Sequence, residues 1–419
     1  MSSRIRHRPE EFGGVLFDLE SKAFFPLNTS GYDLFGLLAR TPDRNELTEK
    51  VRQYYTDILG TAVGSAQARR VTDDFLTGMA GLGVLDDAPR DLLPPDGKAL
   101  PVVSRPTERI SLRAPVVVSL AVDFQCNLLC THCYVGSTAQ PRPDNLRPAE
   151  LCRILDELAE LEVFDVVITG GEPLMLDGIY DVLEHAKRLG FYVCLNTNGT
   201  IVSTAAAQRL RTIGVDVVKI SIDSADPEVH DRFRGGRNAL RRTVEGIRRL
   251  VAAGVRVDTH TVISAESTRT SDDIDAVLSL ARELGVTRAH FGRVFSTGRA
   301  TDELKPSDDI VLRQIAYVAE LAASGEPLVG RQPSSAMPEV ESMPTYDGCG
   351  GCARGIYAYV GYNGGVYPCT NLYKPEWRLG DLRRERLDTV LTESPVFADL
   401  RDRLAVAERA LASHHAGHE

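Results

Sequence analysis

The stretch CNLLCTHCY, residues 126–134, decides how the rest of this sequence is interpreted, because it places three cysteines on one short segment. A disulfide framework uses cysteines in pairs, and a structural zinc site uses four ligands, for which His132 is the only obvious local supplement. Three thiolates on a short loop can instead hold three corners of a cubane iron–sulfur cluster, leaving the fourth iron open to a small molecule. We therefore expect Cys126, Cys130 and Cys133 to bind a cluster, with zinc as the alternative.

Composition limits the classes of partner. The 419 residues carry a formal net charge of −10, which argues against nucleic acid and anionic membranes as binding partners. No apolar run approaches the length needed to span a bilayer, and the N-terminus does not have the pattern of a signal peptide. We expect a cytoplasmic protein of two or three domains.

Eight cysteines are present, and six of them fall into two tight groups. In a long cytosolic chain, clustered thiols indicate metal binding or catalysis rather than disulfides. The other two, Cys152 on a helical pattern and Cys194 in an apolar strand, are expected to be small buried hydrophobic residues.

From residue 115 onward, apolar strand patterns alternate with amphipathic helix patterns. The expected strands cover 116–124, 164–170, 191–197, 215–223, 255–263 and 288–295. This alternation is typical of a parallel sheet with helical crossovers, so the fold class is α/β, either an open doubly wound sheet or most of a barrel. Both architectures place the active site at the C-terminal ends of the strands.

The cysteine motif CX3CX2C, followed by an aromatic residue after the first strand, resembles the radical S-adenosylmethionine (SAM) superfamily. Three further segments resemble motifs of that family in the same order: GGEP after the second strand, TNG after the third and SIDSADPEVHDRFRG after the fourth. The resemblance assigns SAM binding to Tyr134, Gly170, Gly171, Glu172, Pro173, Asn196, Ser221 and Arg234.

These assignments have a chemical basis. A cationic amine requires backbone carbonyls and a carboxylate such as Glu172, and glycines permit close backbone approach. Arg234 offers bidentate pairing to the cofactor carboxylate.

The resemblance implies a partial (β/α)6 TIM-type barrel with a [4Fe-4S] cluster bound by three cysteines plus SAM. In this family, an electron from the reduced cluster cleaves SAM and yields a 5′-deoxyadenosyl radical that abstracts hydrogen from an unactivated carbon. The expected partners therefore include an electron donor such as flavodoxin or ferredoxin.

The second cysteine group comprises Cys349, Cys352 and Cys369. Half of a zinc ribbon is the alternative reading, but the layout after a radical SAM domain resembles the auxiliary-cluster segments called twitch or SPASM. A complete SPASM segment has more cysteines, and none follows Cys369, so we expect one auxiliary iron–sulfur cluster held by these three cysteines. Its fourth position is expected to hold a ligand other than cysteine or a substrate group, or to be an open iron. Between these cysteines, Asn363–Gly364 predicts a hairpin with a type I′ turn.

The N-terminal segment GGVLFD, followed by LNTSG, resembles the winged-helix-like modules that bind leader peptides of ribosomally made, modified peptides (RiPP recognition elements). The expected mechanism is addition of the leader as a strand to an exposed hairpin edge. Winged helices also bind DNA, but residues 1–92 contain 11 Lys+Arg against 14 Asp+Glu, which disfavours a phosphate-binding surface. A vestigial cap is the remaining alternative.

These patterns together predict a radical SAM maturase that oxidatively modifies a precursor peptide through a crosslink, a thioether or a decarboxylation. A radical SAM oxidase of a tetrapyrrole or sugar-like molecule, and a zinc-stabilised winged-helix regulator, are the alternatives. His260, His290 and Arg293 are candidates for substrate contact, or else ordinary buried residues. The expected domains are a leader-recognition domain (1–93), a linker (94–112), the radical SAM barrel (113–300), a helical connection (301–345), the auxiliary-cluster segment (346–390) and a C-terminal helix and tail (391–419).

Overall fold

The computed structural model describes residues 4–20, 22–41, 43–82, 84–85, 112–294, 297–300, 304, 308–329, 355–400 and 402. It divides into two compact units, Met1–Leu112 and Arg113–Glu419, which are described separately below. Cys349 and Cys352 lie outside the described residues. In the described part of the chain, no helix is long and apolar enough to cross a membrane.

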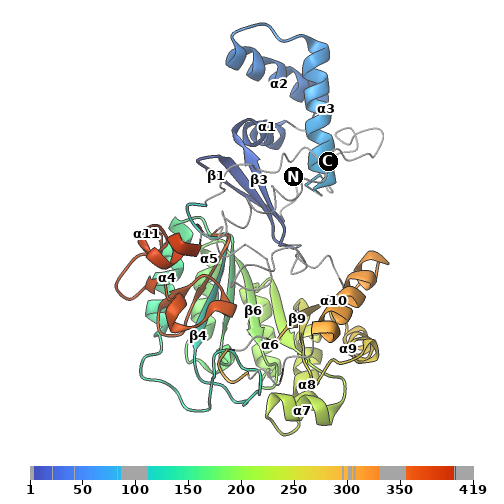
Figure 1. Ribbon diagram of the computed structural model, residues 1–419, viewed down its shortest axis with the longest axis vertical. Coiled ribbons are helices and arrows are strands. Elements are labelled where there is room, and N and C mark those ends of the chain that lie inside the picture. The colour runs from blue at the N-terminus through green and yellow to red at the C-terminus, as the bar shows by residue number, and fades with distance from the viewer. Residues whose placement is uncertain are drawn as a thin grey trace. The chain divides into compact units, whose positions relative to one another are not determined.

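The first unit is a three-stranded antiparallel sheet followed by three helices (Figure 1). Its elements are β1 (Ile5–Glu10), β2 (Gly13–Asp18), β3 (Phe24–Asn28), α1 (Thr29–Arg40), α2 (Arg44–Leu59) and α3 (Ser65–Gly81). Among these elements, β1 is not indicated by its sequence pattern. The polar sequence of β1, IRHRPE, does not show the apolar alternation by which strands are recognised.

One small apolar core holds this unit together. Leu16 on β2, Phe35 on α1 and Leu76 on α3 are almost fully buried in the same cluster. The LNTSG segment begins α1, because the Asn28 side chain accepts a hydrogen bond from the Gly31 backbone nitrogen (2.8 Å).

The second unit is built on one mixed sheet of nine strands in the order β12-β11-β10-β4-β5-β6-β7-β8-β9. Six neighbouring strands are parallel: β4 (Val117–Asp123), β5 (Asp165–Gly170), β6 (Tyr192–Thr197), β7 (Val217–Ser221), β8 (Val257–Ile263) and β9 (Arg288–Arg293). The helices of this region are α4 (Pro148–Glu160), α5 (Ile179–Arg188), α6 (Thr204–Ile213), α7 (Pro227–Arg234), α8 (Ala239–Ala252), α9 (Ser271–Glu283) and α10 (Asp308–Ala323).

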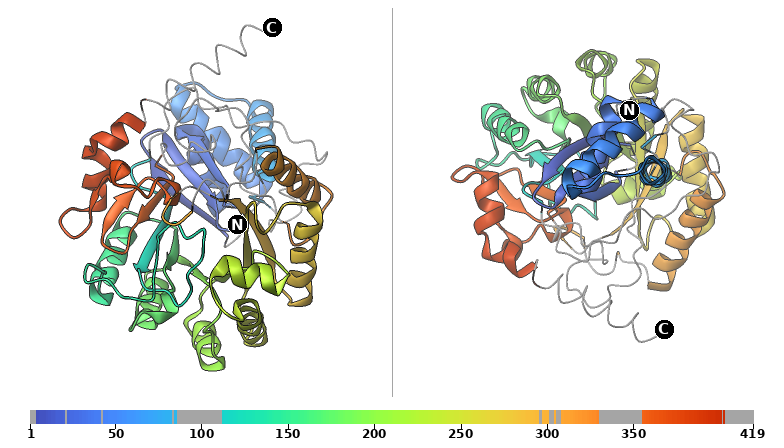
Figure 2. Two further views of the ribbon diagram at one scale, coloured as in Figure 1. Left: turned by 60° about the horizontal axis from the view of Figure 1, so that its bottom comes forward. Right: turned by 90° about the horizontal axis from the view of Figure 1, so that it is seen from above.

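The alternation of side chains along each strand decides which architecture forms. One face carries Val, Leu and Ile, such as Leu120, Ile168 and Ile220, which pack with helix residues in the main core. The opposite face carries many polar residues, and helices α4, α5, α6, α8 and α9 of this unit lie along the first face (Figure 2). Of the two architectures allowed by the sequence, the structure is therefore the open TIM-like barrel, with the helices outside.

The chain returns to this sheet after the barrel. β10 (Tyr357–Val360) pairs in parallel with β4, and β11 (Gly365–Tyr367) and β12 (Gly380–Asp381) extend the sheet further. α11 (Leu387–Glu393) follows, residues 395–400 are also helical, and most of the predicted C-terminal helix lies outside the described residues. Register places Tyr359 beside Ser119 of the first barrel strand, a pairing that spans most of the chain.

The predicted type I′ turn at Asn363–Gly364 is wrong. That turn requires positive φ at both central residues, whereas Gly364 has φ of +82° and Asn363 does not adopt positive φ. The turn is closed by hydrogen bonds from Gly364 nitrogen to Gly361 oxygen (2.9 Å) and from Gly361 nitrogen to Gly365 oxygen (2.8 Å). The Asn363 side chain instead accepts a hydrogen bond from Gly365 nitrogen (3.2 Å).

Candidate active site

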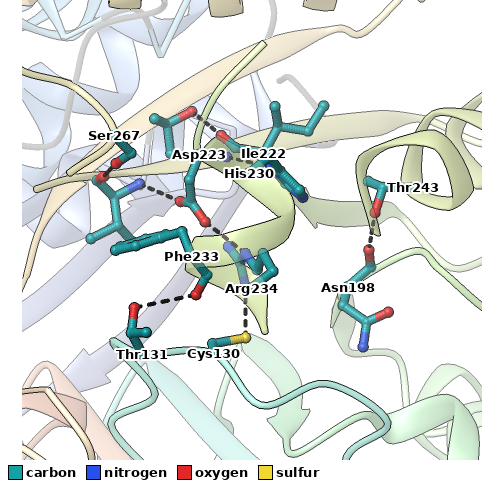
Figure 3. Close-up of polar contacts among 12 residues, drawn as sticks. Cys130, Thr131, Asn198, Ile222, Asp223, His230, Phe233, Arg234, Thr243 and Ser267 are labelled. Atoms are coloured by element: carbon teal, nitrogen blue, oxygen red, sulfur yellow. Dashed lines mark hydrogen bonds and ion pairs between the residues drawn. The ribbon is translucent and has the colours of Figure 1, made fainter. Parts of the chain in front are cut away.

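The three-cysteine loop follows β4 and is held by segments that are distant in the sequence. Thr131 nitrogen donates to Phe233 oxygen (3.0 Å), which joins the loop to α7. Arg299 contacts the loop twice: its backbone nitrogen donates to Cys133 oxygen (2.9 Å), and its Nε donates to Cys130 oxygen (3.0 Å). The loop is therefore fixed by the protein itself, close to the C-terminal ends of the strands (Figure 3).

The GGEP segment lies directly against the start of this loop. Gly171 nitrogen donates to Asp123 oxygen (2.7 Å), and Glu172 nitrogen donates to Gln125 oxygen (2.8 Å). A Cβ atom at Gly171 would lie 2.1 Å from Gln125 oxygen, so a side chain at this position would clash with the backbone. Pro173 is buried and begins the short 3-10 helix that follows.

Glu172 joins the ends of β5 and β6. Its buried carboxylate accepts hydrogen bonds from Thr197 Oγ1 (2.7 Å), Asn198 nitrogen (2.8 Å) and Leu174 nitrogen (3.1 Å). Burial raises the pKa of Glu172 above its usual value. Both carboxylate oxygens already have donors in the protein, and a contact from Glu172 to the SAM amine stays a prediction.

Arg234 lies beside the second cysteine. Its Nη1 is 3.8 Å from Cys130 Sγ, and its Nε is 2.6 Å from Asp223 Oδ2 (Figure 3). Both side chains are buried, with relative exposures of 7% for Arg234 and 0% for Asp223. The sequence predicted that Arg234 pairs with the cofactor carboxylate, whereas in the structure its carboxylate partner is Asp223.

Asp223 is a site residue that the sequence reasoning did not single out, although it is the third residue of the SID motif. Burial alone would raise its pKa, but the nearby Arg234 guanidinium holds the pKa at about 2. Asp223 Oδ1 also accepts a hydrogen bond from Val262 nitrogen (2.9 Å), so it links β8 to the Arg234 side chain.

Two histidines border this ion pair and stay neutral at pH 7. Burial lowers the pKa of His132 to about 3 and that of His230 to about 4. His132 stacks on Phe233 with ring centroids 4.2 Å apart, and His230 Nδ1 accepts a hydrogen bond from Asp223 nitrogen (3.3 Å). Arg234 is therefore the charged partner of Asp223 in this cluster.

The remaining predicted SAM residues are spread along the sheet. Tyr134 follows Cys133 and packs edge-on against Tyr359 of β10, with centroids 6.0 Å apart. Asn196 is on β6, where its Oδ1 accepts from Cys194 Sγ (3.6 Å), and Ser221 ends β7 opposite His260. Gly170, at positive φ, ends β5. The SAM role of each of these residues stays a prediction.

The loop residues fit a bound cluster. All six described cysteines are free thiols, and burial raises the pKa of Cys126 to about 12, so ligation there must displace a proton. Two buried nitrogens, His132 Nδ1 within the loop and Arg299 Nη2 beside it, have no hydrogen-bond partner among the described residues.

Within the described ranges, no three His, Cys, Asp or Glu side chains converge on a single-ion site. Thiolates that bind different irons of a cluster lie farther apart than the ligands of one zinc ion, so this finding and cluster binding do not conflict. In the auxiliary group, only Cys369 is described, and it is partly buried after β11.

The Asp223–Arg234 pair predicts that losing one partner costs the barrel unit more stability than losing both. Replacing Asp223 with Asn leaves a buried, unpaired guanidinium, so we expect the free energy of unfolding of the barrel unit to fall by about 3–5 kcal/mol in urea at pH 7. The double variant Asp223→Asn/Arg234→Met should recover part of this loss. Glu283→Gln, which breaks an exposed pair with Arg248 (3.2 Å), is the control and should cost about 0.5 kcal/mol or less.

The Asp223–Arg234 pair also makes the stability of the barrel unit depend on pH. The folded pKa of Asp223, about 2, lies below its ordinary value of 3.8, so its stabilisation is present above pH 4 and is lost as the pH falls toward 2. The difference in stability between the wild type and Asp223→Asn should shrink over that interval. A pH-independent difference, or equal costs for Asp223→Asn and Glu283→Gln, would contradict the assignment.

Comparisons with known proteins agree with this geometry. Residues 124–281 match the Radical SAM superfamily, and residues 349–413 match SPASM, an iron–sulfur cluster-binding domain. The chain is 30% identical over 304 residues to the AdoMet-dependent heme synthase of Methanosarcina barkeri, covering 69% of this chain and 85% of that protein. It is 28% identical over 294 residues to the mycofactocin maturase MftC of Mycobacterium ulcerans, covering 70% of this chain and 78% of that protein.

Among solved structures, Streptococcus suis SuiB bound to its precursor peptide SuiA has a TM-score of 0.65 at 16% identity, covering 96% of this chain and 90% of that one. At this identity the likeness establishes the fold. The domain matches indicate a [4Fe-4S] cluster, SAM binding and an auxiliary cluster. The cysteine loop, the barrel that supports it and these matches agree, and the chain belongs to the radical SAM superfamily, with a SPASM cluster-binding domain.

Proposed function

We propose that this radical SAM enzyme modifies a ribosomally made precursor peptide. The observation that carries the proposal is the separate N-terminal unit, three strands and three helices that precede the barrel. The likeness to SuiB extends over 96% of this chain, and the relative MftC is a maturase. In this proposal, the N-terminal unit binds the peptide leader, and the inner face of the barrel receives the residue that reacts.

When bound, SAM and the cluster supply a radical that abstracts hydrogen from a carbon of the substrate. The chain's own residues position these groups: Arg299 and Phe233 fix the cysteine loop, and Asp223 holds Arg234 beside Cys130. An oxidative outcome, whether a crosslink, a thioether or a decarboxylation, suits a chain with an auxiliary cluster, because the electron left on the substrate requires an acceptor. An external flavodoxin or ferredoxin would supply the first electron.

A tetrapyrrole is the second candidate substrate. It is favoured by the 30% identity to a heme synthase, the more similar of the two named relatives. In that case the N-terminal unit would have no peptide to bind, and a tetrapyrrole would occupy the barrel.

The first test uses a candidate precursor peptide, which would be sought among short open reading frames beside the gene. Incubated with reconstituted enzyme, SAM and reductant, the peptide should lose two hydrogens for a crosslink or thioether, or carbon dioxide plus two hydrogens for an oxidative decarboxylation. Tandem mass spectrometry reads the change, and chiral analysis after digestion detects epimerisation, which leaves the mass unchanged. An unaltered peptide, together with turnover of an iron coproporphyrin, would refute the peptide proposal in favour of the tetrapyrrole.

The strand-addition mechanism can be tested on the backbone of β3. Asp18 nitrogen donates to Ala23 oxygen (3.0 Å), so by alternation Phe24 and Pro26 direct their backbone groups away from β2. Proline has no N–H, so Phe24 is the donor in the first half of this edge. The pairing partners on β2 are unaffected by a change at that position.

Phe24→Pro should therefore weaken leader binding by about tenfold or more, while the fold stays intact. The matched control is His7→Pro on β1, the opposite edge of the sheet, where the backbone also points away from β2. Fluorescence anisotropy with labelled leader peptide measures both affinities. Loss of binding in the control alone would place the leader on β1, and unchanged binding in both variants would exclude strand addition.

A further inference from the structure

The inner face of the barrel carries a cation, Lys219, that is not among the residues predicted to bind SAM. Val218 and Ile220 of β7 belong to the core under the helices, so Lys219 between them is on the opposite, inner face. Strand register places Lys219 beside Asn196 of β6 and Asp258 of β8. Lys219 is half-buried, and within the described residues its ammonium group has no hydrogen bond or ion pair.

The other described lysines of this unit differ from Lys219. Lys187 forms an ion pair with Asp216, and Lys374 is exposed on the surface. Partial burial of an ammonium group that makes no hydrogen bond or ion pair is costly, and an anion bound beside it would offset that cost.

The nearby carboxylates are already paired. Asp258, which adjoins Lys219, contacts His290 Nε2 (3.1 Å) and Arg256 Nε (3.5 Å). Burial would raise the pKa of Asp258, but the hydrogen bond to His290 and the nearby charges of Arg256 and Lys219 keep it below its usual value. Lys219 and Asp258 therefore attract each other without forming a direct contact. Asp223 is committed to Arg234. The positive charge of Lys219 is therefore not cancelled by a direct contact in the described part of the barrel.

His260 supplies a second polar group next to Lys219. It lies opposite Ser221 and His290, on the same inner face, and its ring packs over Gly292, where a Cβ atom would be 3.0 Å from Nε2. Neither ring nitrogen has a hydrogen-bond partner in the ranges that the structure describes. Burial, with Lys219 and His290 nearby, lowers the pKa of His260 to about 3, so the ring is neutral and has one N–H to donate.

We propose that Lys219 and His260 form a carboxylate-binding subsite on the inner face of the barrel. The ammonium group provides the charge and the imidazole N–H a directed hydrogen bond. One cation with Asp258 close by suits one carboxylate group, with its single charge, better than a phosphate group with two charges on one centre. Resting on the proposed function, the inference is that the peptide presents an acidic side chain or its C-terminal carboxylate to this subsite.

The depth of the subsite fits a substrate. Lys219 is two residues before Ser221, the last residue of β7. Two strand residues correspond to about 7 Å, so Lys219 lies roughly one layer of side chains inside the end of β7, whereas His260, opposite Ser221, is level with that end. A carboxylate bound there would anchor one part of the substrate and leave a neighbouring carbon directed toward the SAM end of the barrel.

The binding test measures the affinity of the reconstituted, SAM-loaded enzyme for glutarate and for its uncharged analogue glutaramide, by ligand-observed NMR. Wild type and the surface control Lys374→Met should bind glutarate equally, with glutaramide at least about tenfold weaker. Lys219→Met and Lys219→Gln should each bind glutarate about tenfold less tightly, and Lys219→Arg should restore most of the affinity. Absence of glutarate binding to the wild type, or equal binding by Lys219→Met, would overturn the subsite.

A second measurement identifies the source of the carboxylate. Each acidic core residue of the peptide is changed to its amide, and the C-terminus is amidated separately. One of these changes should raise KM about tenfold for the wild type and have little effect for Lys219→Met. If the peptide is modified with the same KM by both enzymes, the subsite fails and the peptide function stands. If glutarate binding depends on Lys219 but no peptide is modified, the peptide function fails and the subsite stands, and a tetrapyrrole propionate becomes the substrate group to test.

Discussion

The ion pair between Asp223 and Arg234 connects the parts of the barrel on which the cysteine loop depends. Arg234 ends α7 and lies between Cys130 and Asp223, and Asp223 also binds the backbone of β8. The neighbouring residue Phe233 receives the hydrogen bond from Thr131 of the loop. A buried ion pair of this kind adds little net stability, but a conformation that separates its partners leaves a buried charge uncompensated and is strongly destabilised. The pair therefore favours one arrangement of strand, helix and loop.

The same strands build both the core and the site, because side chains alternate between their two faces. On β7, Val218 and Ile220 face the helices, while Lys219 and Ser221 face inward. The apolar outer face provides burial, and it allows the inner face to keep polar groups that would be unfavourable in a core. A shift in register by one residue would exchange the two faces and remove core and site together.

The sequence allowed the alternation of strands and helices, the cysteine loop and the order of the SAM motifs to be predicted, because each of these is a local pattern. The choice of a barrel over an open sheet came from the family resemblance. The contacts of Asp223 and Arg299 could not be predicted in this way: Arg299 reaches the carbonyl of Cys130 across 169 positions of the sequence. A single sequence gives no signal for such a contact. The SID motif did contain Asp223, but the residue type alone does not distinguish a cofactor contact from a structural ion pair.

Other differences have similar causes. The sequence of β1 is polar, so no apolar alternation marks it as a strand. The parallel pairing of β10 with β4 joins segments that are far apart in the sequence, and no local pattern indicates it. The turn after β10 was misjudged because Asn363 uses its side chain rather than a left-handed backbone to close the turn. The roles of the SAM residues stay predictions, since the geometry shows where they lie rather than what they bind.

The most direct test of this account is electron paramagnetic resonance of the reconstituted, reduced enzyme, recorded with SAM carrying 14N or 15N in its amino group. If Cys126, Cys130 and Cys133 hold a cluster with one open iron, SAM should alter the signal of one cluster and show hyperfine coupling to the amino nitrogen. Cys130→Ala should abolish that response while the auxiliary-cluster signal persists. A spectrum that SAM leaves unchanged in the wild type would contradict the account.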